Sequence, residues 1–101
     1  MKEKEKIAGA LGLCRRAGKI ASGAYLVKEA LIKGKAAVVI LASDAAKNTE
    51  EKVCPIAARN GIPVHRAALN KKEMGAALGE NRDVVCVSVP KEFVNLVLAS
   101  L

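Results

Sequence analysis

The chain has 101 residues and a formal net charge of +7, and 51% of its residues are hydrophobic. This length and hydrophobic fraction favour one compact domain and exclude wholesale disorder. Its only aromatic residues are Tyr25 and Phe93, which argues against a nucleic-acid module that stacks bases on an aromatic platform. The longest apolar stretch, residues 36–42, is far shorter than the roughly 20 residues that span a bilayer, so we expect a cytoplasmic protein.

The hydrophobic pattern alternates between helical and strand periods along the chain. On the second helix, Leu26 and Val27 are expected to face inward, together with Ala30 and Leu31. Residues 36–42 are apolar without alternation, which is typical of a central strand covered by helices on both faces. The expected elements are helix 4–17, extended segment 19–21, helix 23–33, strand 36–42, a helix from Asn48 to Gly61, strand 62–67, a helix from Asn70 to Gly79, strand 84–89 and a last helix beginning at Pro90.

Two asparagines show the spacing of a capping box, in which an N-cap side chain and a Glu three residues later bind each other's backbone N–H groups. Asn48 precedes Glu51 in this way, and Asn70 precedes Glu73. We therefore expect one helix to begin at each asparagine. Pro55 lies within the first of these helices, where it is expected to kink or restart it.

Helices and strands interleave with no linker, low-complexity segment or internal repeat. Strand 62–67 contains Pro63, which has no backbone N–H to donate and therefore fits an edge of the sheet. The sequence predicts one α/β domain over residues 1–101, a three-layer α/β/α sandwich of about four strands and five helices.

Residues that typically carry catalysis are scattered or missing. The chain has no G-x-x-x-x-G-K-[ST] phosphate loop, and its one histidine, His65, has no paired nucleophile. No two carboxylates are placed for acid–base work. The cysteines at 14, 54 and 86 include no closely spaced pair, and each is expected to be a small buried apolar residue. We therefore predict a non-catalytic protein without a metal site or a cofactor.

Most of the positive charge lies in the first third of the chain. Residues 1–35 contain nine basic and three acidic side chains, and the remaining 66 residues contain eight and seven. A localised positive charge favours a polyanionic partner, and charge alone leaves RNA, DNA and an acidic membrane surface open.

The segment 13–23 places basic side chains around a turn and then begins a helix. Arg15, Arg16 and Lys19 surround the turn, and Ser22 and Gly23 stand where the helix begins. The first turn of a helix offers free backbone N–H groups and a partial positive charge, which together bind phosphate. Gly23 has no side chain and permits close approach. The pattern predicts a phosphate-backbone site, although it also fits a simple turn with solvated basic residues.

Several short segments match a known family in their order and spacing. They are Leu11-Gly12-Leu13, Arg15-Arg16-Ala17-Gly18-Lys19, Ser22-Gly23, Lys33-Gly34-Lys35-Ala36, Val39 through Ala45, Asn48-Thr49, Ile62-Pro63-Val64 and the helix with Met74-Gly75 and Gly79. Over about residues 5–95 the chain resembles small bacterial relatives of the kink-turn RNA-binding ribosomal proteins, the superfamily of archaeal large-subunit protein L-seven-Ae. The resemblance implies a four-stranded sheet between helices, and binding of a sharply bent RNA stem by the beginning of the second helix.

The family's binding run is typically Gly-Thr-Asn-Glu-x-x-Lys, and the run aligned with it here is Gly-Ala-Tyr-Leu-Val-Lys-Glu at 23–29. Only Gly23 matches. Tyr25 stands at the Asn position, Leu26 at the Glu position and Glu29 at the Lys position. Because Leu26 cannot accept a hydrogen bond from a guanine edge, the resemblance implies an RNA binder with weak or altered kink-turn specificity.

The resemblance also implies a role for each contact residue. Gly23 would allow close backbone approach, Lys19 and Lys28 would neutralise phosphate, and Tyr25 would touch a base or sugar. Arg82, in the loop at the position of the family's second contact loop, would be peripheral. The complete expected RNA-binding set is Arg16, Lys19, Ser22, Gly23, Ala24, Tyr25, Lys28, Lys33, Asp44 and Arg82. The implied partner is structured RNA, ribosomal or otherwise containing a kink-turn, with the ribosome as a place of association. We expect a monomer without a membrane partner.

Two other functions stay open from the sequence. The first is a protein-interaction module of the same superfamily, in which Tyr25 and Leu26 form an exposed apolar contact. The second is a small-ligand or anion-binding domain, with Asp44 and the helix beginning at Gly23 lining the site. Asp44 follows the carboxyl end of the central strand, where α/β proteins often bind ligands, although a loop or helix-cap role explains it more simply.

Overall fold

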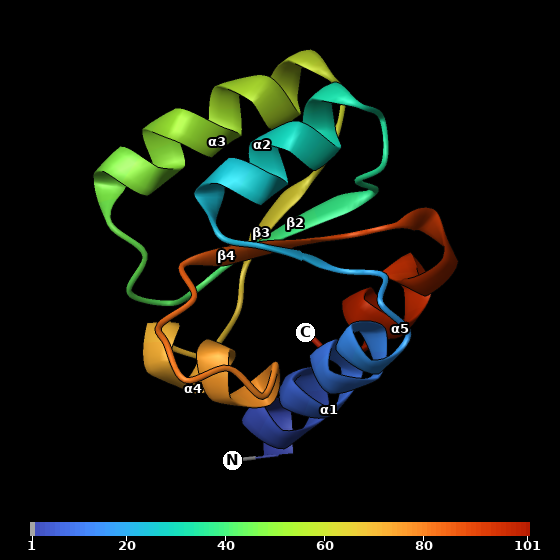
Figure 1. Ribbon diagram of the computed structural model, residues 1–101, viewed down its shortest axis with the longest axis vertical. Coiled ribbons are helices and arrows are strands. Elements are labelled where there is room, and N and C mark those ends of the chain that lie inside the picture. The colour runs from blue at the N-terminus through green and yellow to red at the C-terminus, as the bar shows by residue number, and fades with distance from the viewer. Residues whose placement is uncertain (1) are drawn as a thin grey trace.

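The computed structural model describes residues 2–101, which form a three-layer α/β/α sandwich (Figure 1). The elements are α1 (Lys2–Arg16), β1 (Ala21–Ser22), α2 (Ala24–Ile32), β2 (Val38–Leu41), α3 (Lys47–Arg59), β3 (Val64–Arg66), α4 (Lys71–Ala77), β4 (Cys86–Val89), a short 3-10 turn η1 (Lys91–Phe93) and α5 (Val94–Ala99). Helices α2 and α3 cover one face of the sheet, and α1, α4 and α5 cover the other (Figure 1). The predicted fold class, with four strands and five helices, is confirmed.

The four strands have the order β1–β4–β2–β3. Strand β4 is antiparallel to both β1 and β2, and β3 is parallel to β2. It follows that β1, β2 and β3 all end at the same side of the sheet, which we call the carboxyl end. Its connections are residues 23, 42–46, 67–70 and 78–85. At the opposite side, the amino end, lie the connections 17–20, 33–37 and 60–63 and the segment 90–93 after β4.

The two central strands form the middle of the core. Every residue of β2 and of β4 is buried, because helices cover both faces of the sheet at these positions. The central position expected for residues 36–42 is therefore confirmed, as is the edge position of the strand that follows Pro63. Cys14 and Cys86 are buried as expected, whereas Cys54 is half-buried. Within residues 2–101, no helix is long and apolar enough to cross a membrane.

Of the two expected capping boxes, the structure confirms one. Asn70 Oδ1 accepts from the Glu73 N–H at 2.8 Å, and Glu73 Oε1 accepts from the Asn70 N–H at 2.9 Å. The prediction that Asn48 begins a helix is wrong, because α3 starts one residue earlier and has Ala46 as its N-cap without a side-chain hydrogen bond. Asp44, the nearest carboxylate in that loop, instead binds the backbone N–H of Lys71.

Two further expectations about the helices need correction. Pro55 lies inside α3, which runs continuously from Lys47 to Arg59, so the proline does not restart the helix, and a kink there stays a prediction. Leu26 was expected to face inward with Val27, but its exposed fraction is 49%. Leu26 is the third residue of α2, and only Val27 and Leu31 of that helix are fully buried.

Candidate nucleic-acid interface

The beginning of α2 lies at the carboxyl end of the sheet, directly after β1. Gly23 is its N-cap with φ 90°, a conformation that glycine adopts far more readily than other residues. The Gly23 N–H donates to the carbonyl of Cys86 at 2.9 Å, and the Gly23 carbonyl accepts from the Val27 N–H at 3.0 Å. The first bond holds the turn against central strand β4, and the second begins the hydrogen bonding of α2. The N–H groups of residues 24–26 have no carbonyl one turn earlier in the helix, so three backbone donors point out of its end.

Three polar side chains meet beside this turn. Ser22 Oγ donates to Glu80 Oε2 at 3.2 Å, and Arg82 Nε donates to Glu80 Oε1 at 2.8 Å. Arg82 Nη2 also lies 3.4 Å from Ser22 Oγ. We call this group the Ser22–Glu80–Arg82 cluster. Its carboxylate is held by two donors, and the exposed Arg82 side chain lies beside Ser22, directly before the beginning of α2.

Gly75 allows the loop that contains Arg82 to lie this close. A Cβ atom at Gly75 would stand 1.9 Å from the Arg82 carbonyl oxygen, so the loop rests on the bare backbone of α4. Two further bonds hold it there: the Glu80 N–H donates to the Gly75 carbonyl at 2.9 Å, and the Val84 N–H donates to the Lys71 carbonyl at 3.0 Å. The position of the cluster is therefore determined by α4 as well as by α2.

Next to the cluster, α2 exposes apolar and basic side chains. The exposed fractions of Tyr25 and Leu26 are 73% and 49%, and Lys28 lies one turn further along, half-buried. Tyr25 can stack on a base or donate one hydrogen bond through its hydroxyl. The interface therefore combines backbone donors, a guanidinium and one aromatic ring.

The structure does not bring the other expected contact residues to this place. Arg16 ends α1 and Lys19 follows it, both at the amino end of the sheet. Lys33 Nζ forms an i,i+4 ion pair with Glu29 at 3.3 Å near the far end of α2. Asp44 lies at the carboxyl end, but its Oδ1 accepts from the Lys71 N–H at 2.8 Å and so holds the beginning of α4. Asp44 thus has a capping role, but at α4 and not at the neighbouring α3, where the sequence placed it.

Sequence reasoning missed Glu80 and Gly75 as parts of the interface. Glu80 is in contact with Ser22 across 58 residues of sequence, and no local pattern predicts such a contact. Gly75 did leave a signal. A glycine inside a helix costs about 1 kcal/mol relative to alanine, so it usually has a packing reason.

Fold and site together define a small α/β domain with a polar surface at the beginning of its second helix. The chain belongs to the Ribosomal protein L7Ae/L30e/S12e/Gadd45 family, whose model matches residues 5–96. This confirms the family expected from the sequence.

Individual proteins and structures show the same relationship. The chain is 30% identical over 91 residues to the RNA-binding protein YlxQ of Bacillus subtilis (strain 168), an alignment that covers 90% of both chains. A protein of unknown function from Bacillus halodurans C has a similar structure, with a TM-score of 0.85, 30% identity and coverage of 94% of this chain and 95% of that one. A 15.5 kD RNA binding protein of Giardia lamblia shares the fold, with a TM-score of 0.76 and 19% identity over 99% and 85% of the chains.

Proposed function

We propose that this protein binds structured RNA, without catalysis, through the beginning of α2. The observation that carries the proposal is the convergence of Arg82, Ser22 and the three backbone donors after Gly23 in a member of this family. Family membership and the RNA-binding name of the Bacillus subtilis relative support RNA as the partner.

The RNA that fits this surface best is a sharply bent stem of the kink-turn type. At a bend the groove widens and exposes both phosphates and base edges, and the interface offers a group for each. Backbone donors at a helix start bind phosphate, the Arg82 guanidinium binds phosphate or a guanine edge, and Tyr25 stacks on a base. Leu26 offers no polar group, so discrimination between bent stems rests on Tyr25 and Arg82. Ribosomal RNA, and hence association with the ribosome, is the natural setting for such a stem.

The test is equilibrium binding to a kink-turn stem and to a matched straight duplex, each at two salt concentrations. The wild-type protein should prefer the bent stem. Tyr25→Ala should reduce that preference about tenfold, because stacking contributes about 1–3 kcal/mol per base. Arg82→Gln should weaken binding to both RNAs and lower the salt slope by about 1.

The control variant is Lys52→Gln, which removes one positive charge from an exposed position of α3 and should bind both RNAs like the wild-type protein. Equal and steeply salt-dependent binding to the two RNAs would mean that the protein recognises phosphates but does not recognise the bend. Absence of binding to either RNA would contradict the proposal.

A protein-interaction module is the second candidate, and the exposed apolar side of α2 favours it. Tyr25, Leu26 and Ile32 are all exposed, Ile32 by 64%. If this is their role, a partner protein should stay bound after nuclease treatment and should be lost in Leu26→Ser, a substitution that leaves the charged groups of the interface intact.

A further inference from the structure

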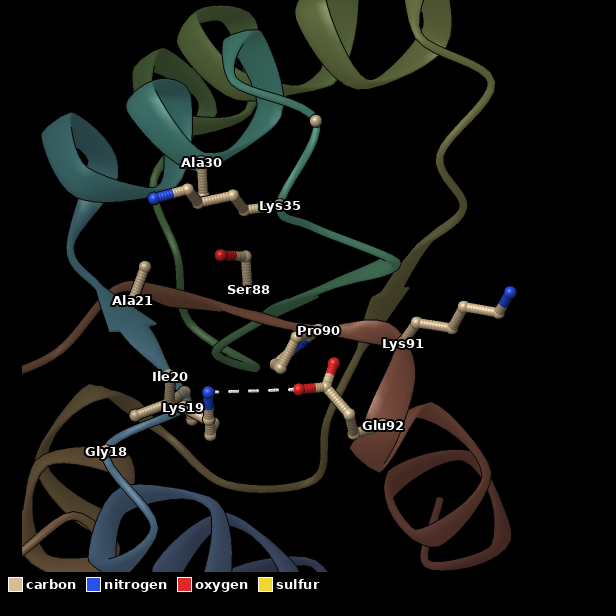
Figure 2. Close-up of a pocket in the computed structure, with 11 residues that line it drawn as sticks. Gly18, Lys19, Ile20, Ala21, Ala30, Lys35, Ser88, Pro90, Lys91 and Glu92 are labelled. Carbon is tan, nitrogen blue, oxygen red and sulfur yellow. Dashed lines mark ion pairs between the residues drawn. The ribbon is translucent and has the colours of Figure 1, made fainter.

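A groove of about 490 Å³ opens at the amino end of the sheet, opposite the proposed RNA interface (Figure 2). It is lined by Gly18, Lys19, Ile20, Ala21, Ala30, Gly34, Lys35, Ser88, Pro90, Lys91 and Glu92. These residues come from connections 17–20 and 33–37 and segment 90–93 of the amino end, together with β1, α2 and β4. The volume lies within the range of about 300–1,000 Å³ that is usual for sites of small ligands.

The groove exists because three small side chains meet where α2 crosses the sheet. Ala21 of β1 and Ser88 of β4 are directly opposite each other in the antiparallel pair, so both side chains lie on the same face. Ala30 of α2 faces the same space (Figure 2). Larger residues at these positions would fill the space between helix and sheet, as Val27 and Leu31 do in the adjoining core.

The rim of the groove is basic. Lys19 and Lys35 line the groove, whereas the side chain of Lys91 points away from it (Figure 2). Lys19 Nζ lies 4.0 Å from Glu92 Oε2, and both side chains are more than half exposed, so this contact is weak. Ser88 is only 3% exposed, and its hydroxyl points into the groove (Figure 2).

The charge of the two ends supports an anion at this place. The connections of the amino end, with segment 90–93, contain four basic side chains and one acidic side chain, whereas those of the carboxyl end contain one and three. The amino end is therefore the more positive of the two, and a concave surface with one sign of charge concentrates counter-ions.

We propose that this groove binds a phosphate group, presented by a free nucleotide or by a strand of RNA. In the complex the Ser88 hydroxyl donates to a phosphate oxygen, and the Lys35 ammonium group neutralises the phosphate charge. Lys19 exchanges its weak contact with Glu92 for a contact with the phosphate. The proposal does not rest on RNA binding by α2, because none of the Ser22–Glu80–Arg82 cluster lines the groove.

The experiment follows backbone amide chemical shifts of the whole protein during titration with adenosine monophosphate, with inorganic phosphate and adenosine for comparison. Both phosphate compounds should move the amide signals of Ala21, Lys35 and Ser88 at lower concentrations than those of Tyr25 and Arg82. Adenosine should move none of them. Shifts spread evenly over the lysines of the surface would overturn the proposal, because they indicate unspecific ion binding.

Three substitutions change the expected affinity for adenosine monophosphate in different directions. Ser88→Ala should lower it about tenfold, because a hydrogen bond to a charged group is lost. Lys35→Gln should lower it about fivefold. Glu92→Gln should raise it about threefold, because Lys19 is released and a repelling carboxylate is removed. Lys52→Gln is the charge-matched control for Lys35→Gln and should bind like the wild-type protein.

A final titration identifies the source of the phosphate. If a bent RNA stem moves the Ser88 amide signal and Lys35→Gln weakens that RNA, the groove takes a strand of the bound RNA. If only adenosine monophosphate moves the Ser88 amide signal, the groove is a separate nucleotide site. Wild-type affinity in both Ser88→Ala and Lys35→Gln would contradict the proposal, whereas failure of the RNA interface would appear separately, in Tyr25→Ala and Arg82→Gln.

Discussion

The two ends of the sheet are made of similar short connections but offer different chemistry. At the carboxyl end, two of the three acidic side chains are bound within the protein: Asp44 accepts from the Lys71 N–H, and Glu80 accepts from Ser22 and Arg82. The surface there is preorganised and presents backbone donors. At the amino end, lysines surround a hollow of small side chains, and Lys19 is only loosely held by Glu92. A rigid polar surface recognises the shape of a ligand and gives specificity. Mobile lysines around a groove recognise mainly the charge of a ligand.

The difference shows why the charge of the first third does not locate the site. The chain passes from the amino end to the carboxyl end between Lys19 and Gly23, and α2 then returns it to Lys33 and Lys35. Lys19, Lys33 and Lys35 therefore all lie at the amino end, away from the beginning of α2. Family likeness points to the carboxyl end, and the positive charge of the connections points to the amino end.

Gly75→Ala should have the largest effect and should break only the carboxyl end. The added Cβ meets the Arg82 carbonyl, so the free energy of unfolding should fall by about 1–3 kcal/mol, as in other overpacked sites. RNA affinity should fall with it, and binding of adenosine monophosphate in the groove should not change. Gly9→Ala in α1 is the control, since its Cβ meets nothing within 4 Å, and it should raise the free energy of unfolding by up to about 1 kcal/mol. Urea denaturation measures both, and a stabilised Gly75→Ala would refute the account of the loop.

The second-largest effect should come from acidification, which should lower the free energy of unfolding through Glu73 at the carboxyl end of the sheet. The Asn70 N–H and then the Lys4 ammonium group hold the pKa of Glu73 below its ordinary value of 4.5. The folded state therefore prefers the carboxylate, so this contribution to stability is complete above pH 4.5 and is lost as the pH falls through the lowered pKa. We expect urea denaturation at a series of pH values to show the largest difference in free energy of unfolding between the wild-type protein and Glu73→Gln at neutral pH. The difference should disappear in acid. Glu51→Gln, on the exposed side of α3, should follow the wild-type protein throughout, and a constant gap for Glu73→Gln would contradict this prediction.

The smallest expected effect is a change in the rate of thiol labelling. This experiment compares one cysteine at each end of the sheet within the same molecule. Cys14 lies next to the amino end and Cys86 at the carboxyl end, and both are buried. Burial raises the pKa of Cys14, and burial together with the neighbouring Cys54 raises the pKa of Cys86 to about 11. At pH 8 both thiols should react slowly, because the thiolate is the reactive form.

The labelling is done in a Cys54→Ala background and followed by mass spectrometry. Adding Gly75→Ala to this background should speed the reaction of Cys86 and leave that of Cys14 unchanged. Equal acceleration of both thiols would mean that the substitution loosens the whole domain rather than one end.

The order and type of the elements follow from the sequence because burial and periodicity are local properties. The apolar run 36–42 can only be covered on both faces, and the Asn70–Glu73 spacing acts through bonds within one turn. The same spacing at Asn48 failed, since the start of α3 is set by a loop whose Asp44 is bound to a distant backbone N–H. The residue at which a helix begins therefore depends on the other contacts of the loop before it.

The interface itself was predictable only in part. Gly23 and its helix start are visible in the sequence because a glycine before an amphipathic segment is a local signal. The contact of Arg82 with Ser22 spans 60 residues, and it depends on β4 entering the sheet antiparallel between β1 and β2. The groove depends on the same insertion, since Ser88 and Ala21 form its floor. Pairing between strands so far apart has no local signature.

The insertion of β4 also determines when the domain can form. β1, β2 and β3 precede residue 86 in the chain, yet the place between β1 and β2 stays empty until the last strand has been made. Contacts across such long separations slow folding, because the loop entropy is lost before the contacts form. During synthesis the hydrogen bonds between β4 and its two neighbours form only after β4 has left the ribosome. Neither end of the sheet is complete before that step, so both surfaces mature together and late.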